Sequence, residues 1–257
     1  MSFLHRLRFA VAAPLGVQPV RPARADNSVA LIGRPAMSAS PVSVPVATPA
    51  GPAYAPRTTR SSNGLKEFLW HLDGVGRGQL LDVGPVWQHT VGFFIERGFR
   101  VYSEDLLSEW QSFRSGEDEK VRALGPGEGD EDMTPAGRAE RFLRTSLQHK
   151  PDSLDGILLW DLLDYFDSAL GASVVARVSS LVRDGGVVMA LFHSRKPEGF
   201  HRYRVVDAHN IELIGAPSPA APQRAYQNRE IQDLFGRFRS SKMFVGRDQV
   251  REGLFVK

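Results

Sequence analysis

The sequence predicts an α/β domain with a mostly parallel sheet, helices on both faces and an antiparallel C-terminal strand. Two observations carry this prediction. Short apolar runs alternate with segments of helical spacing between residues 78 and 192. The chain then ends in two strand-like runs, Lys242 to Gly246 and Arg251 to Val256, joined by a short polar turn. Two strands connected in this way pair antiparallel.

Residues 1–60 form a Pro/Ala/Arg-rich N-terminal tail that we expect to be disordered. They hold nine of the 17 prolines and show no persistent period of 2 or 3.6 residues. They also hold seven arginines against one acid, Asp26, which leaves 25 of the 32 basic and 28 of the 29 acidic side chains to the rest. The basicity therefore belongs to the tail, and the charge of the body does not favour a nucleic-acid-binding surface.

The first residues, MSFLHRLRFAVAAPLGV, have the basic-then-apolar shape of a signal peptide, but Pro14 interrupts the apolar part and Arg24 crowds the cleavage site. An organelle transit peptide and an untargeted tail are the alternatives. No apolar run approaches the roughly 18 residues that span a bilayer, and we expect a cytoplasmic protein. The absence of cysteine excludes disulfides, thiolate metal sites and cysteine nucleophiles.

A domain is expected over residues 61–257. Asn63 is predicted to cap its first helix, because Leu65, Phe68 and Leu72 follow at helical spacing. This helix would lead into the first strand of the sheet.

Residues 78–107 contain the central unit of strand, tight turn, helix and strand. Gln79 to Val83 is an apolar run long enough for a buried parallel strand, and Gly84 comes next with backbone freedom that other residues lack. The second strand ends at Asp105. A right-handed unit of this length places Gly84 and Asp105 at the carboxyl edge of the sheet, where open α/β sheets bind ligands.

This unit resembles the cofactor half of class I S-adenosylmethionine (SAM) dependent methyltransferases. Asp82 and Gly84 match the start of the family motif D-x-G-x-G-x-G, whereas Val86 and Gln88 replace its second and third glycines. Asp105 matches the family's acidic residue that closes the next strand and holds the ribose hydroxyls. The resemblance implies a Rossmann-like sheet of seven strands and SAM as the cofactor.

The segment after Asp105 departs from the family pattern. Leu106, Trp110 and Phe113 predict a short helix, but no third strand is readable after it. Residues 115–133 are acidic and rich in glycine, and we expect a surface loop. Thr134 and Pro135 then predict the start of another helix.

Residues 154–166, LDGILLWDLLDYF, resemble the family's fourth motif, an apolar strand whose polar end faces the methyl group. Asp161 is the polar end here. For Trp160, core packing explains the residue as well as a pocket role does. A turn at Gly185 and Gly186 then precedes another apolar strand, a pattern frequent in the family.

Residues 195–227 are an insertion before the next helix, for which Asn228 is the predicted cap. The insertion alternates around a turn at His209-Asn210, as a small hairpin would. In the family, segments at this place often cover the methyl acceptor, so the insertion is a possible acceptor cover.

The sequence indicates candidate site residues but no certain catalytic one. Methyl transfer mainly requires alignment, and a general base only where the acceptor holds its proton. The candidates near strand ends, each more often structural than catalytic, are Asp161, Asp164, Tyr165 and His193. The cofactor-binding residues implied by the resemblance are Asp82, Gly84, Glu104, Asp105, Trp160 and Asp161. None of the seven histidines has a partner at zinc-ligand spacing, and no metal site is expected.

The resemblance implies a SAM-dependent methyltransferase that acts on a small-molecule or protein acceptor, with a small molecule slightly favoured. A non-catalytic module of the same fold is an alternative, supported by the side chains at Val86 and Gln88. A nicotinamide-dependent oxidoreductase ranks lower, because the sequence lacks G-x-G-x-x-G. The sequence does not indicate the acceptor or the oligomeric state.

Overall fold

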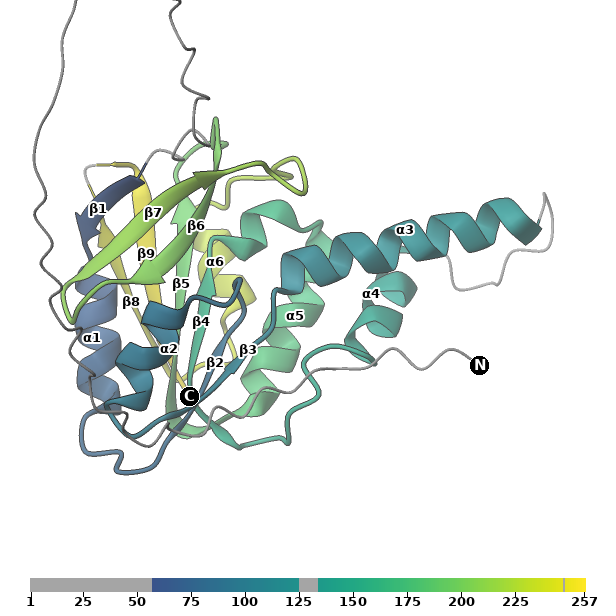
Figure 1. Cartoon of the computed structure of the whole chain (residues 1–257). Coiled ribbons are helices and arrows are strands. Elements are labelled where there is room, and N and C mark those ends of the chain that lie inside the picture. Colours follow the sequence, from purple (N-terminus) through teal and green to yellow (C-terminus); the bar gives the residue numbers. More distant parts are fainter. Residues whose placement is uncertain (1–56, 125–133, 247) are drawn as a thin grey trace, which may run out of the picture. The chain divides into compact units, whose positions relative to one another are not determined.

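The computed structural model describes residues 57–124, 134–246 and 248–257, so residues 1–56 of the tail predicted over 1–60 lie outside it. The main sheet has six strands in the order β3-β2-β4-β5-β9-β8, and a separate three-stranded sheet has the order β1-β7-β6 (Figure 1). No helix in the described ranges is long and apolar enough to cross a membrane.

Apart from β1 and the short helix η1, which the sequence did not predict, the elements occur in the predicted order. In chain order they are β1 (Arg57–Ser61), α1 (Asn63–Leu72), β2 (Gln79–Asp82), α2 (Gln88–Ile95), β3 (Arg100–Ser103), α3 (Leu106–Leu124), α4 (Pro135–Leu143), β4 (Leu154–Trp160), the 3₁₀ helix η1 (Leu162–Tyr165), α5 (Ser168–Leu181), β5 (Val182–His193), β6 (Phe200–Val205), β7 (Asn210–Ala216), α6 (Asn228–Leu234), β8 (Ser240–Val245) and β9 (Val250–Val256).

The strand directions confirm the predicted topology. β2 runs parallel to β3 and β4, and β4 runs parallel to β5. β9 is antiparallel to both β5 and β8. Because only a short turn joins β8 to β9, these two strands pair as a hairpin, and β9 inserts between β8 and β5.

The seven-stranded sheet implied by the resemblance is wrong, because the main sheet has six strands among the described residues. The chain between β3 and β4 forms α3 and α4, and the loop after α4 contacts the end of β3 through side chains. The ring of His149 meets the ring of Tyr102 edge-on at a centroid distance of 4.8 Å. The backbone N–H of Leu147 donates to Glu104 at 2.9 Å. The loop after α4 is thus joined to β3 through side chains of β3 and the loop, whereas a further strand would pair with β3 through backbone hydrogen bonds.

The surface loop expected after Phe113 needs correction. Residues 115–124 continue α3, and two of their acids pair with α4: Glu117 lies 2.5 Å from Arg141, and Asp118 lies 4.0 Å from Arg138. The rest of that expected loop, residues 125–133, lies outside the described residues.

The helix caps differ from the predicted ones by one residue at two places. Ser62, not Asn63, caps α1 by accepting from the N–H of Leu65, and Gln227, not Asn228, caps α6 in a capping box. Thr134 caps α4 as predicted. In each case the cap is the last residue in extended conformation, which is where a side chain can reach the first N–H groups of the helix.

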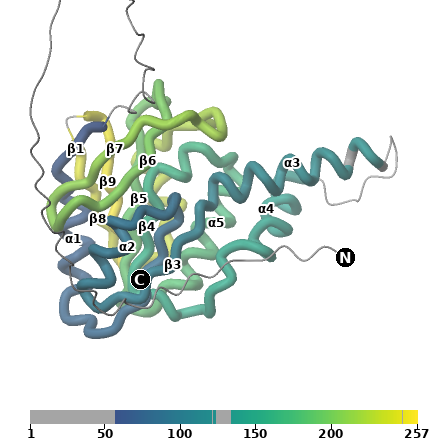
Figure 2. Tube along the Cα trace, viewed as in Figure 1, coloured from purple at the N-terminus to yellow at the C-terminus, as the bar shows by residue number. Residues whose placement is uncertain are grey.

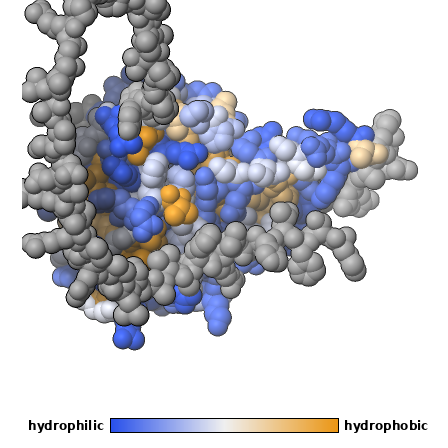
Figure 3. Space-filling view, in the orientation of Figure 1, coloured by the Kyte–Doolittle hydropathy of each residue, from blue (hydrophilic) through white to orange (hydrophobic). Residues whose placement is uncertain are grey.

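The core has two parts, one on each face of the sheet. Alternate strand residues point to opposite faces, so Leu81 packs with α3, α4, α5 and α6, whereas Leu80 packs with α1 and α2. Tyr203 and Val205 of the β6–β7 hairpin join the α1–α2 side. Figure 2 shows the hairpin crossing the main sheet, and in Figure 3 the hydrophobic residues on this face lie in separate patches among hydrophilic ones.

β1 takes in residues 57–60, which the sequence assigned to the tail. It pairs with β7 from Arg57 opposite Ile214 to Ser61 opposite Asn210. Arg60 also reaches Glu252 on β9, with Nη2 and Oε1 2.5 Å apart, and the same carboxylate accepts from the N–H of Gly64 at 2.5 Å. Glu252 is 2% exposed, so this ion pair ties β1 and α1 to the main sheet.

Candidate functional site

The carboxyl ends of β2, β3 and β4 meet at one edge of the main sheet. Asp82 at the end of β2 is level with Ser103 on one side and Leu158 on the other. The hydroxyl of Ser103 donates to the carbonyl of Gly84 at 3.2 Å. The turn at Gly84 therefore lies at the carboxyl edge of the sheet, where the sequence predicted it, and in contact with the ends of β3 and β4.

Asp82 is buried beneath this turn and is 1% exposed. Its Oδ1 accepts hydrogen bonds from the backbone N–H of Gly84 at 3.0 Å and from the indole N–H of Trp160 at 2.7 Å. Burial raises the pKa of Asp82 to about 6, although both hydrogen bonds oppose the rise, and the nearby charge of Asp105 adds to it.

Trp160 packs directly against the turn. Its φ of +51° and the register shift between Leu158 and Trp160 mark an irregular strand end. The indole stacks on Tyr203 at a centroid distance of 5.5 Å and an interplanar angle of 8°. A methyl group added at Gly84 would lie 3.0 Å from Cδ1 of Trp160. Glycine at this position thus allows the close approach of the indole.

Asp161 lies beside Trp160 and is also buried. The hydroxyl of Tyr203 donates to its Oδ2 at 3.0 Å. Burial raises the pKa of Asp161 to about 7, with His193 opposing the rise and the charge of Asp164 adding to it. Nδ1 of His193 lies 3.9 Å from Oδ2 of Asp161.

Asp164 and His193 form a close pair at the ends of η1 and β5. Oδ2 of Asp164 accepts from the backbone N–H of His193 at 2.9 Å and lies 2.9 Å from its Nδ1. Burial lowers the pKa of His193, but the hydrogen bond to Asp164 and the charge of Asp161 outweigh it, and the net shift is upward. Oδ1 of Asp164 has no partner among the described residues, although the residue is 0% exposed.

Tyr165 is the fourth catalytic candidate, and it lies in the core. Its ring meets Phe200 of the insertion edge-on at 5.3 Å. Its hydroxyl is buried without a hydrogen-bond partner in the described ranges. Burial, and then the charges of Asp161 and Asp164, raise the pKa of Tyr165. Because the charges of Asp161 and Asp164 act on Tyr165, and His193 contacts both acids, the four candidates lie close together at the carboxyl edge.

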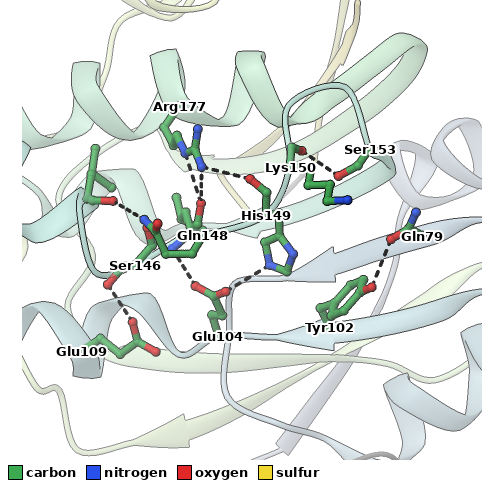
Figure 4. Close-up of polar contacts among 12 residues, drawn as sticks. Gln79, Tyr102, Glu104, Glu109, Ser146, Gln148, His149, Lys150, Ser153 and Arg177 are labelled. Atoms are coloured by element: carbon green, nitrogen blue, oxygen red, sulfur yellow. Dashed lines mark hydrogen bonds and ion pairs between the residues drawn. The ribbon is translucent and has the colours of Figure 1, made fainter. Parts of the chain in front are cut away.

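The two acids at the end of β3 make different contacts. Glu104 points into the loop after α4, where it accepts from Leu147 N–H and lies 3.0 Å from Nε2 of His149 (Figure 4). Arg177 holds the same loop through the carbonyls of Leu147 and His149. These contacts give Glu104 a structural role and do not favour the prediction that it binds the cofactor.

Asp105 stays at the edge itself. Its Oδ1 accepts from the backbone N–H of Ser108 at 3.2 Å, which caps α3. No described residue donates to its Oδ2, and its charge is close enough to raise the pKa of Asp82. Asp105 is therefore the strand-end acid that remains available to a ligand.

Sequence reasoning missed Tyr203, which contacts two of the candidate residues. The alternation in the insertion indicates that Tyr203 shares a face with Val205, but it does not indicate what that face covers. The insertion reaches the edge at a second place, where the backbone N–H groups of Gln223 and Arg224 donate to the carbonyl of Asp164.

One cavity lies away from this edge. A cavity of about 560 Å³, lined in part by Gly78, Gln79, Phe99 and Arg100, lies at the amino ends of β2 and β3. In the part of the chain that the structure describes, no three His, Cys, Asp or Glu residues are grouped to hold a metal ion.

Comparison with known proteins found no matching family model and no matching curated protein. Three of the similar solved structures are methyltransferases. The 1,6-didemethyltoxoflavin-N1-methyltransferase of Burkholderia thailandensis, with bound S-adenosylhomocysteine, has 18% identity and a TM-score of 0.39 over 76% of this chain and 77% of that one.

A SAM-dependent methyltransferase of Clostridium acetobutylicum has 14% identity and a TM-score of 0.38 over 75% of this chain and 90% of that one. Magnesium protoporphyrin IX methyltransferase of Synechocystis PCC 6803, with bound S-adenosylhomocysteine, has 15% identity and a TM-score of 0.38 over 75% and 80%. Similarities of this size assign no activity to this chain, and the bound S-adenosylhomocysteine belongs to those two structures.

Proposed function

We propose that the chain is a SAM-dependent methyltransferase that binds its cofactor at the carboxyl edge of β2, β3 and β4. One observation carries the proposal: the turn at Gly84, the carboxylate of Asp105 and the polar end of β4 lie at the same edge. The antiparallel β9 within a parallel sheet supports it, because a nicotinamide-binding doubly wound sheet is expected to be parallel here.

The ribose end of SAM fits this edge. Asp105 uses one carboxylate oxygen to cap α3, which holds the side chain in place, and no described residue donates to the other oxygen. A carboxylate accepts charge-assisted hydrogen bonds from hydroxyls, and these are the stronger kind. Asp105 would hold the ribose hydroxyls.

The methionine end of SAM does not fit with the side chains as they stand. The indole of Trp160 fills the space beside Gly84, and the carboxylate of Asp82 already accepts two hydrogen bonds. Binding of the whole cofactor would require Trp160 to move. This contact also favours our second candidate function, a non-catalytic module of the same fold.

His193 is our choice for a proton acceptor. A neutral ring that donates from Nδ1 to Asp164 keeps Nε2 as its acceptor nitrogen, and a pKa above the ordinary value suits proton transfer near neutral pH. Asp164 would orient the ring. A small-molecule acceptor suits the site better than a protein segment, because Asp161 and Asp164 are buried.

The proposal is tested by thermal shift of the full chain with SAM, S-adenosylhomocysteine and NAD. A ligand that binds only the folded state raises Tm as its occupancy increases. We expect SAM and S-adenosylhomocysteine to raise Tm and NAD to leave it unchanged. No shift with either SAM compound at millimolar concentration would favour the non-catalytic module, and a shift with NAD alone would favour the oxidoreductase.

A further inference from the structure

We propose that Trp160 and Tyr203 form an aromatic latch that closes the cofactor's methionine site, and that the latch opens when the β6–β7 hairpin shifts. The proposal rests on the proposed function. By latch we mean four residues on three elements: Asp82 at the end of β2, Trp160 and Asp161 at the end of β4, and Tyr203 on β6.

Each end of the aromatic stack is tied to a buried acid. The indole N–H of Trp160 donates to Asp82 at 2.7 Å, and the hydroxyl of Tyr203 donates to Asp161 at 3.0 Å. The two rings between them are nearly parallel. Breaking one tie leaves a buried carboxylate with fewer partners, which is costly, so the contacts hold one another in place.

The latch occupies the residues that a ligand would use. Asp82, Gly84, Trp160 and Asp161 were expected to contact the cofactor, and in this structure each contacts another member of the group or Tyr203. A bound cofactor and a closed latch therefore exclude each other beside Gly84. The latch thus sets how often the free protein is competent to bind, and this fraction scales the apparent affinity.

The hairpin that carries Tyr203 has a second attachment nearby. The N–H of Val205 donates to the hydroxyl of Thr90, and Nδ1 of His89 lies 2.8 Å from the carbonyl of Val205. Both partners are on α2, directly after the glycine turn. A shift of β6 relative to α2 would therefore move Tyr203 away from Trp160 and open the space above Gly84.

The backbone of Trp160 favours release. A left-handed conformation is unfavourable at a residue other than glycine, and Trp160 adopts it at φ +51°. The hydrogen bond to Asp82 and the stack on Tyr203 offset this strain in the closed state. Once the stack is lost, nothing offsets the strain at Trp160, and the end of β4 can relax to an ordinary backbone conformation.

The first test measures hydrogen exchange of the indole N–H of Trp160 by NMR in the full chain without ligand. Tyr203→Phe keeps the ring and removes the tie to Asp161, and we expect the indole N–H to exchange at least ~10-fold faster. Tyr102→Phe is the matched control, because it also removes a tyrosine hydroxyl bond, to Gln79, away from the latch. Equal exchange in the wild type and in Tyr203→Phe would overturn the proposal.

The second test titrates SAM into the wild type and into Trp160→Phe, which loses the bond to Asp82. We expect roughly threefold to tenfold tighter binding in the variant, because a larger fraction is open. Equal or weaker binding in a folded variant would overturn the latch. If the indole exchange responds as predicted but neither protein binds SAM, the closing contact stands and the proposed cofactor fails, so the two failures are distinguishable.

Discussion

The indole N–H of Trp160 donates to the carboxylate of Asp82 across 2.7 Å, which joins two residues 78 positions apart in the sequence. One is the acid of a glycine turn and the other ends the neighbouring parallel strand. Their contact satisfies a buried carboxylate and places an aromatic ring against Gly84. Under the proposed function, binding of the cofactor at this edge depends on whether the contact is kept or broken.

Asp82→Asn is expected to make stability less dependent on pH. The pKa of Asp82 is raised in the folded protein, from 3.8 to about 6, so the folded state binds more protons than the unfolded state between these values. Stability must then fall as pH rises through this window, on the order of 2–3 kcal/mol for a shift of this size. Asn keeps an acceptor for Trp160 and removes the titration.

Urea unfolding at pH 4.5 and pH 7.5 measures this difference. Asp161 titrates in the same direction in both proteins, so the comparison isolates Asp82. Asp184→Asn, at an exposed position, is the control and should behave as the wild type. An equal loss of stability with pH in the wild type and in Asp82→Asn would show that Asp82 is not buried as described.

Asp164→Asn is expected to lower the pKa of His193. The carboxylate is the strongest influence that raises this pKa, through a 2.9 Å hydrogen bond, and without it burial dominates. NMR titration of the His193 ring protons measures the shift. Asp248→Asn is a graded control, because Asp248 also raises the pKa of His193 but contributes less. A pKa unchanged in Asp164→Asn would remove the basis for assigning His193 as the proton acceptor.

Arg60→Ala is expected to destabilise the fold by about 3–5 kcal/mol, because it leaves the buried carboxylate of Glu252 with only the N–H of Gly64 as a donor among the described residues. Lys242→Ala is the matched control. It removes a cation paired with Glu67 at the surface, where a pair is worth about 1 kcal/mol or less. Chemical denaturation compares the two, and equal losses would contradict a buried role for the Arg60–Glu252 pair.

A chain that begins at Arg57 is expected to keep the Tm of the full chain, because residues 1–56 offer no periodic apolar face to bury. A chain that begins at Gly64 loses β1 and the Arg60–Glu252 pair and should melt many degrees lower. Calorimetry of the three chains tests both statements. A large drop for the chain from Arg57 would show that the tail packs on the body.

The parts of the site that depend on local pattern and connectivity could be predicted from the sequence. Gly84 and Asp105 end successive parallel strands, so the topology alone brings them to one edge. Asp82 could be placed there for the same reason, but its partner could not. Trp160 meets Tyr203 only because the insertion folds back over β4, and alternation within the insertion shows which side chains share a face without showing what that face covers.

The differences from the predictions have equally specific causes. The run after Phe113 resembled a loop because it is acidic and rich in glycine, but residues 115–124 continue α3, and Glu117 and Asp118 pair with arginines of α4, further along the chain. Glu104 was predicted to bind the cofactor beside Asp105. The two side chains leave the strand end in different directions, and Glu104 accepts from the backbone N–H of Leu147. The expected seventh strand came from the family resemblance and not from any apolar run in this chain.

Calorimetric titration of SAM into the wild type, Asp105→Asn and Asp184→Asn tests the central claim most directly. Asn can still cap α3, so the variant removes the charge that would face the ribose and keeps the helix start. A lost bond to a charged group costs roughly 1.5–3 kcal/mol, so we predict that Asp105→Asn binds SAM about tenfold to a hundredfold more weakly, with circular dichroism unchanged. Glu104→Gln should weaken SAM binding much less. The assignment of the cofactor site is contradicted if the wild type gives no binding heat, or if Asp105→Asn and Asp184→Asn bind SAM as tightly as the wild type.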